Sequence, residues 1–344
     1  MNVQAIVLPY YGIGDFLSNL AFINALLRKF PKDKFIIFTK SRTKAKNLMS
    51  NIKNVKIFYI KDKYNFFSSI TNLFFLRSFF LKKKIKKIWI FHRSPRYAIV
   101  SFFSKVKDIL GYGYGIQKLF LNSGNFLNND VKKSIPVIKA YQFLKINNVK
   151  LDPLEPFLKV SNKNITKIRK KFKKFPKPWI LIGFSSTDRS RTWKNNYFAQ
   201  LIQLLNKKKK YTFFLVGAPY ESDEANKIIK LSRLKGTNIK NFCRSIEETM
   251  ALMKQSYFYI GNDAGNAHLS LACKLKTYII HGGSPPYSQT VYKNNYPKKF
   301  LKNLNPILAS DGVIRNPNLK TTDTVPQEHG MDLIKPEYVC NFLF

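Results

Sequence analysis

The chain has 344 residues and a formal net charge of +41, from 60 Lys and Arg against 19 Asp and Glu. This length favours two domains over one, and a hydrophobic content of 45% excludes global disorder. The three cysteines lie far apart without a Cys-x-x-Cys pair, which predicts a reduced protein that holds no structural zinc.

The positive charge predicts an anionic partner, either a membrane, a phosphorylated glycolipid or a nucleic acid. A composition rich in lysine and asparagine is also typical of AT-rich coding. The lysine clusters at 82–87, 167–174 and 207–210 lie between predicted elements, so the charge indicates the sign of the partner and no more. The first residues lack the pattern of a signal peptide, and we expect a cytoplasmic protein.

Four short apolar runs in each half of the chain are each followed by a loop and a stretch with helical periodicity. They are 5–9, 35–38, 55–60 and 87–91, then 179–184, 212–216, 257–261 and 277–281. Nearly continuous apolar strands that alternate with helices predict parallel sheets covered on both faces. Ligands of such sheets bind at the carboxyl ends of the strands, so the loops that follow the strands are the candidate sites.

A boundary between two domains is predicted within 151–179, which is rich in proline and lysine. We expect a first domain at 1–158, a linker at 159–177 and a second domain at 178–330. A short closing helix is expected at 331–344. The predicted fold is therefore two doubly wound α/β domains that face a cleft.

The stretch 66–81 is the most apolar segment, but Asn72 and Arg77 interrupt it and lysines follow it. It is too short and too polar to span a bilayer. A core helix is the favoured interpretation, and a helix that rests on a membrane surface is the alternative.

The first predicted strand leads into "YYGIGDFL". Gly12 and Gly14 permit a tight turn, and the following helix offers free N–H groups to an anion. The third glycine of the dinucleotide fingerprint is absent and Leu17 stands there, which disfavours an oxidoreductase. Asp15 begins the helix as a cap or as a general base, and spacing alone favours the cap.

Polar loops also follow the first two strands of the second half. In "GFSSTDRSRTWK", the hydroxyls of Ser186 and Thr187 and the guanidinium of Arg191 suit a phosphate, although an ordinary polar loop explains them as well. Trp193 is interpreted as a packing residue. In "VGAPYESDEA", Glu221 is either a partner of the helix dipole or a carboxylate that binds a ribose.

The third strand of the second half ends in "GNDAGNAH". Asp263 ends the strand, Gly265 lets the backbone approach a ligand, and His268 lies in the first turn of the next helix. Free N–H groups, the helix dipole and an imidazole together suit a diphosphate, whereas a capped helix with an incidental histidine is the alternative. After the next strand, Gly282 and Gly283 in "HGGSPPYSQT" open the backbone at the same edge and favour a site.

Taken in this order, the loops resemble those of glycosyltransferase family 9, the bacterial heptosyltransferases of the lipopolysaccharide inner core. "GIGDFLSNLAFINALLRKFP" is similar to the opening segment of the family, and "GFSSTDRSRTWK" and "VGAPYESDEA" to its phosphate loop and its glycine–glutamate turn. "NDAGNAHLSLACKLKTYIIHGGSPP" resembles its most specific signature, in which aspartate, Ser/Thr and glycine precede a histidine and a glycine–proline turn. The resemblance covers both halves of the chain.

The resemblance implies two Rossmann-like domains in the GT-B arrangement. It also implies inverting transfer of a heptose, without metal or cofactor, from ADP-heptose to an inner-core acceptor of lipopolysaccharide or lipooligosaccharide. Asp15 is then the catalytic base, and Arg191, assigned to catalysis, holds the diphosphate. The remaining donor-binding residues are Ser186, Thr187, Glu221, Asp263, Ala264, Gly265 and His268.

Together with the charge, the resemblance predicts an anionic glycolipid acceptor and peripheral contact with the anionic inner face of the cytoplasmic membrane, without a nucleic acid partner. Three residues depart from the family pattern. Ala264 replaces a hydroxyl residue, Pro285 an acid and Arg191 a lysine. Transfer of another activated sugar to a surface glycan is therefore the alternative. A basic nucleic-acid-binding protein is a further one, which leaves Asp15, Asp263 and His268 unexplained.

Overall fold

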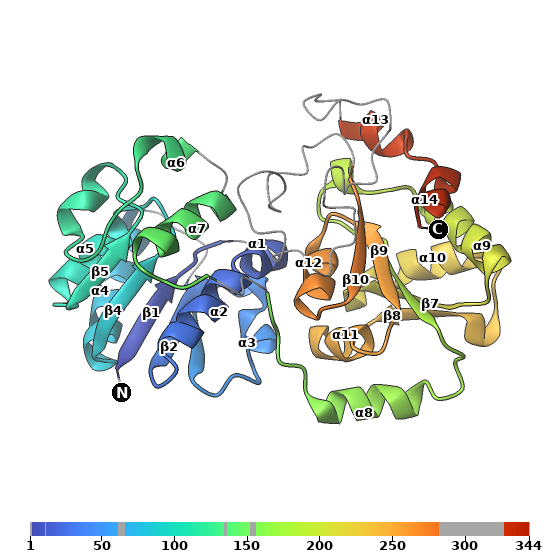
Figure 1. Cartoon of the computed structure of the whole chain (residues 1–344), viewed down its shortest axis with the longest axis horizontal. Helices are drawn as coiled ribbons and strands as arrows, with labels where there is room; N and C mark the ends of the chain where they lie inside the picture. The colour runs from blue at the N-terminus through green and yellow to red at the C-terminus, as the bar shows by residue number, and fades with distance from the viewer. Residues whose placement is uncertain are drawn as a thin grey trace. The chain divides into compact units, whose positions relative to one another are not determined.

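The computed structural model describes residues 2–10, 12–60, 66–133, 136–151, 156–281 and 327–343. The chain divides into two compact units, unit 1 at Met1–Pro156 and unit 2 at Phe157–Phe344. Each unit contains a five-stranded parallel sheet with helices on both faces (Figure 1). The predicted α/β fold with two doubly wound, Rossmann-like units is confirmed.

Unit 1 has the strand order β3-β2-β1-β4-β5. Its strands are β1 (Val3–Val7), β2 (Lys34–Lys40), β3 (Val55–Ile60), β4 (Ile85–Ile90) and β5 (Asp108–Gly111). Its helices are α1 (Ile13–Ser18), α2 (Leu20–Lys29), α3 (Ala45–Leu48), α4 (Phe66–Lys82), α5 (Arg96–Phe103), α6 (Asn129–Lys133) and α7 (Pro136–Ile146), with short 3-10 turns η1 (Ser41–Thr43) and η2 (Gly115–Phe120).

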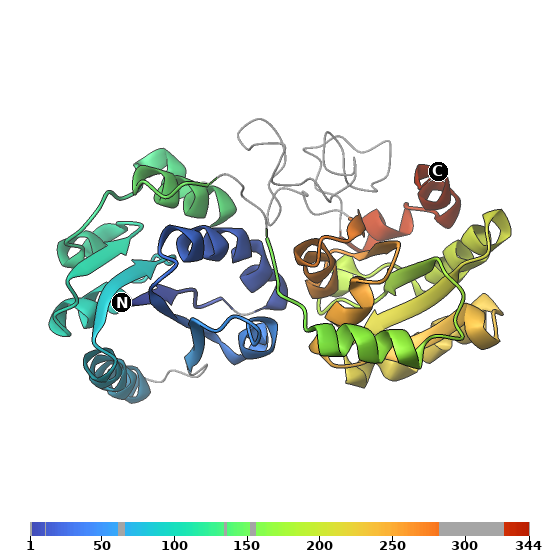
Figure 2. The ribbon, with the colours of Figure 1, turned by 60° about the horizontal axis from the view of Figure 1, so that its bottom comes forward.

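Side-chain alternation along the strands divides unit 1 into two apolar layers. Ala5 and Val7 of β1 pack in one cluster with Phe80 of α4 and with residues of α5. On the other face Trp89 packs against Phe143 of α7, with ring centroids 6.1 Å apart. Figure 2 shows α4 on the opposite side of the sheet from α2 and α7. Both faces of each central strand are thus buried, which explains the continuous apolar runs in the sequence.

Unit 2 has the strand order β10-β9-β6-β7-β8. Its strands are β6 (Trp179–Gly183), β7 (Thr212–Gly217), β8 (Ile239–Cys243), β9 (Phe258–Asn262) and β10 (Lys276–Ile280). Its helices are α8 (Asn162–Lys171), α9 (Asn195–Lys208), α10 (Ser222–Ser232), α11 (Ile246–Met253), α12 (Gly265–Ala272), α13 (Gln327–Asp332) and α14 (Pro336–Phe342), with 3-10 turns η3 (Arg189–Arg191), η4 (Pro219–Glu221) and η5 (Gly236–Asn238). Figure 1 shows α9, α10 and α14 on one face of the sheet and α11 and α12 on the other.

The stretch 159–177, expected to be a linker, contains α8. Ile168 and Phe172 are buried, and the Phe172 ring lies 5.1 Å from that of Phe214 in β7. The lysines of this stretch lie on the exposed side of a helix whose apolar side packs on unit 2. The density of lysines indicated a linker. The apolar residues at helical spacing instead pack this stretch on unit 2 as a helix.

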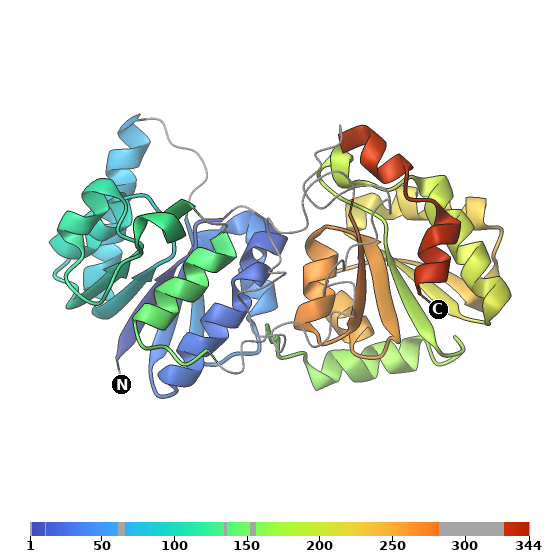
Figure 3. The same ribbon diagram turned by 45° about the horizontal axis from the view of Figure 1, so that its top comes forward.

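The end of the chain packs on unit 2. Trp193 is fully buried, and its indole N–H donates to the carbonyl of Ile334, which joins α13 to α14, over 2.8 Å. Trp193 is therefore the packing residue that the sequence predicts. Figure 3 shows α14, in red, beside α9, and α13 contacts the turn η3.

The apolar stretch around 66–81 forms α4, which buries Leu76 and Phe80 against the sheet. This confirms the core-helix interpretation for those side chains. Among the residues that the structure describes, no helix has the length and hydropathy needed to cross a bilayer.

Candidate active site

The loops after β6, β7, β9 and β10 leave the same edge of the unit 2 sheet, because these strands are parallel and adjacent. Asn262, the last residue of β9, holds the loop after β6 against the end of β9. Its side-chain NH2 donates to the carbonyl of Phe184 over 2.7 Å, and its Oδ1 accepts from the N–H of Trp193 over 3.0 Å. Both ends of the polar loop after β6 are therefore held against β9.

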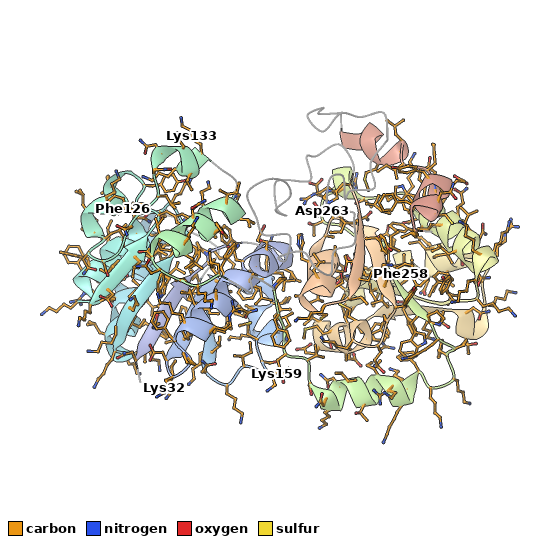
Figure 4. The ribbon with its side chains drawn as sticks, viewed as in Figure 1. Lys32, Phe126, Lys133, Lys159, Phe258 and Asp263 are labelled. Carbon is orange, nitrogen blue, oxygen red and sulfur yellow. The ribbon has the colours of Figure 1, made fainter. Side chains whose placement is uncertain are left out.

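Asp263 follows at this edge and is only 4% exposed (labelled in Figure 4). Three basic side chains face its carboxylate. Oδ2 lies 3.7 Å from Nη1 of Arg191 and 3.7 Å from Nδ1 of His281, and Oδ1 lies 3.5 Å from Nε2 of His268. The carboxylate is thus surrounded by groups that carry, or can take up, positive charge.

The ionisation of Asp263 follows from two opposing effects. Burial alone raises the pKa of the carboxyl, but His281, His268 and Arg191 outweigh burial and lower the pKa below its usual range. Within the described part of the chain, neither Oδ1 of Asp263 nor Nε2 of His268 has a hydrogen bond of good geometry. Buried polar atoms in this state are typical of sites that bind a ligand.

His281 is the residue of this cluster that the sequence analysis missed. The register of β9 and β10 pairs Asn262 with Ile280, so the next residues, Asp263 and His281, leave the sheet side by side. The sequence pattern that could have indicated it is a histidine directly after a predicted strand and before Gly282 and Gly283.

Arg191 lies in η3 between two carboxylates. Its Nε is 3.1 Å from Oδ2 of Asp188, a second residue that the sequence analysis did not single out. The backbone N–H of Asp188 in turn donates to Oγ of Ser186 over 3.2 Å. Thr187 is exposed beside them. The structure therefore brings Ser186, Thr187 and Arg191 to the edge that carries Asp263.

The start of α12 provides backbone donors. Ala264 is the residue before the helix and has no side-chain group that could cap it, so the N–H groups of Gly265 and Asn266 lack a cap from that position. Glu221, after β7, accepts from the N–H of Ala218 over 2.5 Å and so caps its own turn. Its role with a nucleoside stays a prediction, and Gly282, Gly283 and Pro285 lie outside the described residues.

The candidate base of unit 1 also has a structural role. Oδ2 of Asp15 accepts from the N–H of Gly12 over 3.0 Å, and Gly14 lies with Asp15 in the first turn of α1. The carboxylate is partly exposed at the carboxyl edge of the sheet. The capping interpretation is confirmed, and the capping bond fixes the orientation of the carboxylate.

Basic side chains follow the neighbouring strands of unit 1. Lys40 ends β2 and is fully buried, and His92, Arg93 and Arg96 follow β4. Burial, followed by the charges of Arg96, Arg93 and Lys40, lowers the pKa of His92 to about 4. Burial, with a smaller contribution from Asp15, raises the pKa of Tyr10 to about 12. This edge is suited to an anionic ligand.

No group of three or more His, Cys, Asp or Glu side chains is arranged to hold a metal ion within the described ranges. Besides the carboxylates of Asp15 and Asp263, the candidate groups at these edges are cations, histidines, hydroxyls and backbone N–H groups.

Two doubly wound units, each with charged groups at its carboxyl edge, form the fold of GT-B glycosyltransferases. The chain belongs to glycosyltransferase family 9 (heptosyltransferase), whose family model matches residues 94–306. It is a glycosyltransferase, and the resemblance drawn from the loops is confirmed.

One curated relative and two solved structures illustrate the similarity. Lipooligosaccharide heptosyltransferase 2 of Campylobacter jejuni is 26% identical over 309 residues, which cover 84% of this chain and 80% of the relative. The ADP-heptose lipopolysaccharide heptosyltransferase II of E. coli superposes with a TM-score of 0.70 at 16% identity, over 100% of this chain and 97% of that one. A family 9 glycosyltransferase of Veillonella parvula superposes with a TM-score of 0.71 at 15% identity, over 99% and 95%. At these identities the two structures show the shared fold.

Proposed function

We propose that the chain transfers a heptose from ADP-heptose to an inner-core acceptor of lipopolysaccharide or lipooligosaccharide, with inversion and without a metal. The buried Asp263, faced by Arg191, His268 and His281 at the start of α12, is the observation that carries the proposal. The names of the curated relative and of the E. coli structure support the sugar and the acceptor class.

The donor occupies the carboxyl edge of unit 2 in this proposal. Its diphosphate meets the N–H groups of Gly265 and Asn266, the guanidinium of Arg191 and the hydroxyls after β6, while Glu221 contacts the nucleoside. Asp263 accepts hydrogen bonds from the sugar. The positive charge and the N–H donors stabilise the diphosphate as it departs, which is the task that a metal performs in other transferases.

Asp15 acts as the base of unit 1. It removes the proton of the acceptor hydroxyl while the oxygen attacks the anomeric carbon on the face opposite the diphosphate. The new glycosidic bond forms as the bond from carbon to phosphate oxygen breaks, so the configuration inverts.

The acceptor is an anionic glycolipid in this proposal. Lys40, Arg93 and Arg96 gather positive charge at the same edge as Asp15 and suit its phosphate or carboxylate groups, and the same charges help to keep His92 neutral. The excess of basic residues over the whole chain supports an enzyme that works at the anionic inner face of the cytoplasmic membrane.

A thermal-shift titration with ADP, UDP, GDP and their sugar conjugates tests the donor site. We expect ADP-heptose to stabilise the protein most, Asp263→Ala to remove the effect, and Asp108→Ala to keep it. Asp108 is the matched control because it is an ion-paired acid of unit 1, 3.5 Å from Lys87. Stabilisation by another sugar nucleotide would reassign the donor. Ala264, which stands in place of a hydroxyl residue, is the departure that could change the donor.

The rate of transfer should be unchanged in EDTA. A loss of activity that a divalent ion restores would contradict the metal-free step.

A further inference from the structure

Unit 1 exposes a set of large apolar side chains that its core does not use. They lie on α4, α5 and η2, and we call them the phenylalanine patch: Phe74, Phe75, Leu81, Phe102, Phe103, Ile116 and Leu119. Phe74 is 68% exposed and Leu119 77%. In the described part of unit 1, every exposed large hydrophobic residue lies between positions 74 and 126. Apolar groups gathered in this way mark an interaction surface.

Printed contacts join the three elements of the patch. Nε of Arg77 in α4 donates to the carbonyl of Phe103 at the end of α5 over 3.2 Å. The rings of Phe102 and Phe103 lie 5.7 and 6.4 Å from that of Phe120, the last residue of η2. The exposed side chains therefore form one surface that runs from α4 across α5 to η2.

The core of unit 1 is complete without the patch. The inner side of α4 buries Leu76 and Phe80, and the Phe80 ring lies 5.3 Å from that of Phe38 in β2. The inner side of α5 is buried as well, through Tyr97, Ala98 and Val100. Phe75 also stacks on Phe58 of β3, with ring centroids 5.9 Å apart, but it is still 55% exposed. The outer phenylalanines thus leave much apolar surface uncovered, which calls for a partner outside the unit.

The charges around the patch identify the partner. Between positions 74 and 119 the chain has a single acid, Asp108, and Lys87 pairs with it at 3.5 Å. The basic residues of the same range are Arg77, Lys82, Lys83, Lys84, Lys86, Lys87, Arg93, Arg96, Lys105, Lys107 and Lys118. Just beyond the range, the ring of Phe126 (labelled in Figure 4) lies under Nζ of Lys118, 5.4 Å from its centroid. Aromatic side chains among an excess of cations suit a surface that is apolar below and anionic above.

We propose that the phenylalanine patch is the surface with which the enzyme binds an anionic bilayer. The phenyl rings enter the boundary between headgroups and acyl chains, and the surrounding lysines contact anionic headgroups. A second copy of the chain fits poorly, because a symmetric contact would place cations against cations. A nucleic acid would use the lysines but leaves the exposed rings of α4 and α5 without a role. The purpose of the surface rests on the glycolipid acceptor proposed above, but its test does not.

Co-sedimentation with vesicles that contain no acceptor tests the surface in the full-length protein. We expect binding to vesicles of phosphatidylcholine with phosphatidylglycerol, and much weaker binding to phosphatidylcholine alone. The double variant Phe102→Ser/Phe103→Ser should lower the affinity at least tenfold, since two rings lose their burial. Lys82→Gln/Lys83→Gln should also lower it at least tenfold, since each lysine near an anionic surface contributes about fivefold.

Matched variants in unit 2 serve as controls. Leu231→Ser/Tyr257→Ser removes two apolar side chains of similar exposure, 49% and 53% against 48% and 58%, and Lys209→Gln/Lys210→Gln removes the same charge. Both controls should bind as the native protein does. Equal binding by patch and control variants would overturn the proposal.

Two further results would assign the surface to another partner and contradict the proposal that it binds a bilayer. One is a native dimer that becomes monomeric in the phenylalanine variant while vesicle binding persists. The other is binding to an RNA duplex that both patch variants lose while they keep vesicle binding. Transfer to a water-soluble acceptor should be equal in patch variants and native protein. If the protein transfers heptose to no acceptor, the proposed function is wrong. The co-sedimentation result still shows whether the phenylalanine patch binds an anionic bilayer.

Discussion

At the scale of the residue, Asp263 shows how a buried acid stays charged. Burial favours its neutral form, but two histidines and an arginine within 3.7 Å favour the carboxylate more strongly. Such a group is already oriented before a ligand arrives, because its partners lie directly after β10, on α12 and in η3. Its pKa shift also links this site to the stability of the protein.

Asp263→Asn should lower the free energy of unfolding at pH 7 by about 3 kcal/mol, because the three basic groups lose their buried counter-charge. A carboxyl whose pKa is lower in the folded protein stabilises it above the unfolded-state pKa of about 4, and the contribution disappears as pH falls through the folded-state pKa. Urea unfolding of both proteins from pH 7 to pH 3 measures this. The difference between them should shrink below about pH 4, and a difference that is independent of pH would show that the charge is not its source.

Asp15→Asn should reduce the rate of transfer by about 10²- to 10⁴-fold, the usual contribution of a general base. The affinity for the donor should stay within a factor of two, because the proposed donor site belongs to unit 2. Asp33→Asn is the matched control, since Asp33 also accepts from a backbone N–H, that of Asn2 over 2.9 Å, at the other edge of the same sheet. Steady-state kinetics with a separate binding titration distinguishes the roles. Normal turnover with a weakened donor affinity would exclude Asp15 as the base.

At the scale of the element, the site depends on how closely β6 and β9 approach. Gly183 and Gly261 are opposite each other in the register of these strands. A Cβ at Gly261 would lie 2.2 Å from the carbonyl oxygen of Gly183, and one at Gly183 would meet the Tyr259 hydroxyl. The two strands that carry the polar loop after β6 and Asp263 therefore pack together only with glycine at both positions.

Gly261→Ala should cost about 3 kcal/mol or more, because backbone atoms must separate to admit the methyl group. Gly236→Ala is the control. Gly236 has φ +65° with open space around its Cα, so alanine there costs only about 1 kcal/mol of conformational strain. Chemical denaturation of the two variants measures the difference. Equal losses would show that the close approach is not what requires glycine.

At the scale of the whole molecule, each unit has its own sheet and its own apolar clusters. The residues assigned to the donor, from Ser186 to His268, all belong to unit 2, whereas Asp15 belongs to unit 1. The division of the chain thus separates donor binding from the proposed base.

Residues 157–344 expressed alone should therefore fold and bind the nucleotide of the donor, without catalysing transfer. Thermal unfolding of the fragment with and without ADP measures both properties, and Asp263→Ala in the fragment should abolish the shift. A fragment that folds cooperatively but ignores ADP, while the full chain responds to it, would show that unit 1 contributes to nucleotide binding.

The eight apolar runs of the sequence all became strands, because buried parallel strands leave a strong local signal. They correspond to β1, β2, β3, β4, β6, β7, β9 and β10. The short edge strands β5 and β8 were not predicted. An edge strand needs fewer apolar residues, β5 has only four residues, and "IKNFC" of β8 has two polar residues at its centre. The glycine turns and polar loops after the strands likewise indicated the candidate site, because these residue types favour turns and ligands wherever they fold.

The sequence by itself determined the α/β class, the family and the loops that carry the site, since periodicity, turn residues and loop order are local properties. Tertiary structure alone decided which side chains meet. His281 became a neighbour of Asp263 through the register of β9 and β10, and Asp188 became a partner of Arg191 through the turn of η3. Phe103 and Arg77 likewise meet only because α4 and α5 cover the same face of one sheet. Contacts between residues distant in sequence depend on strand order and register, which no local pattern encodes.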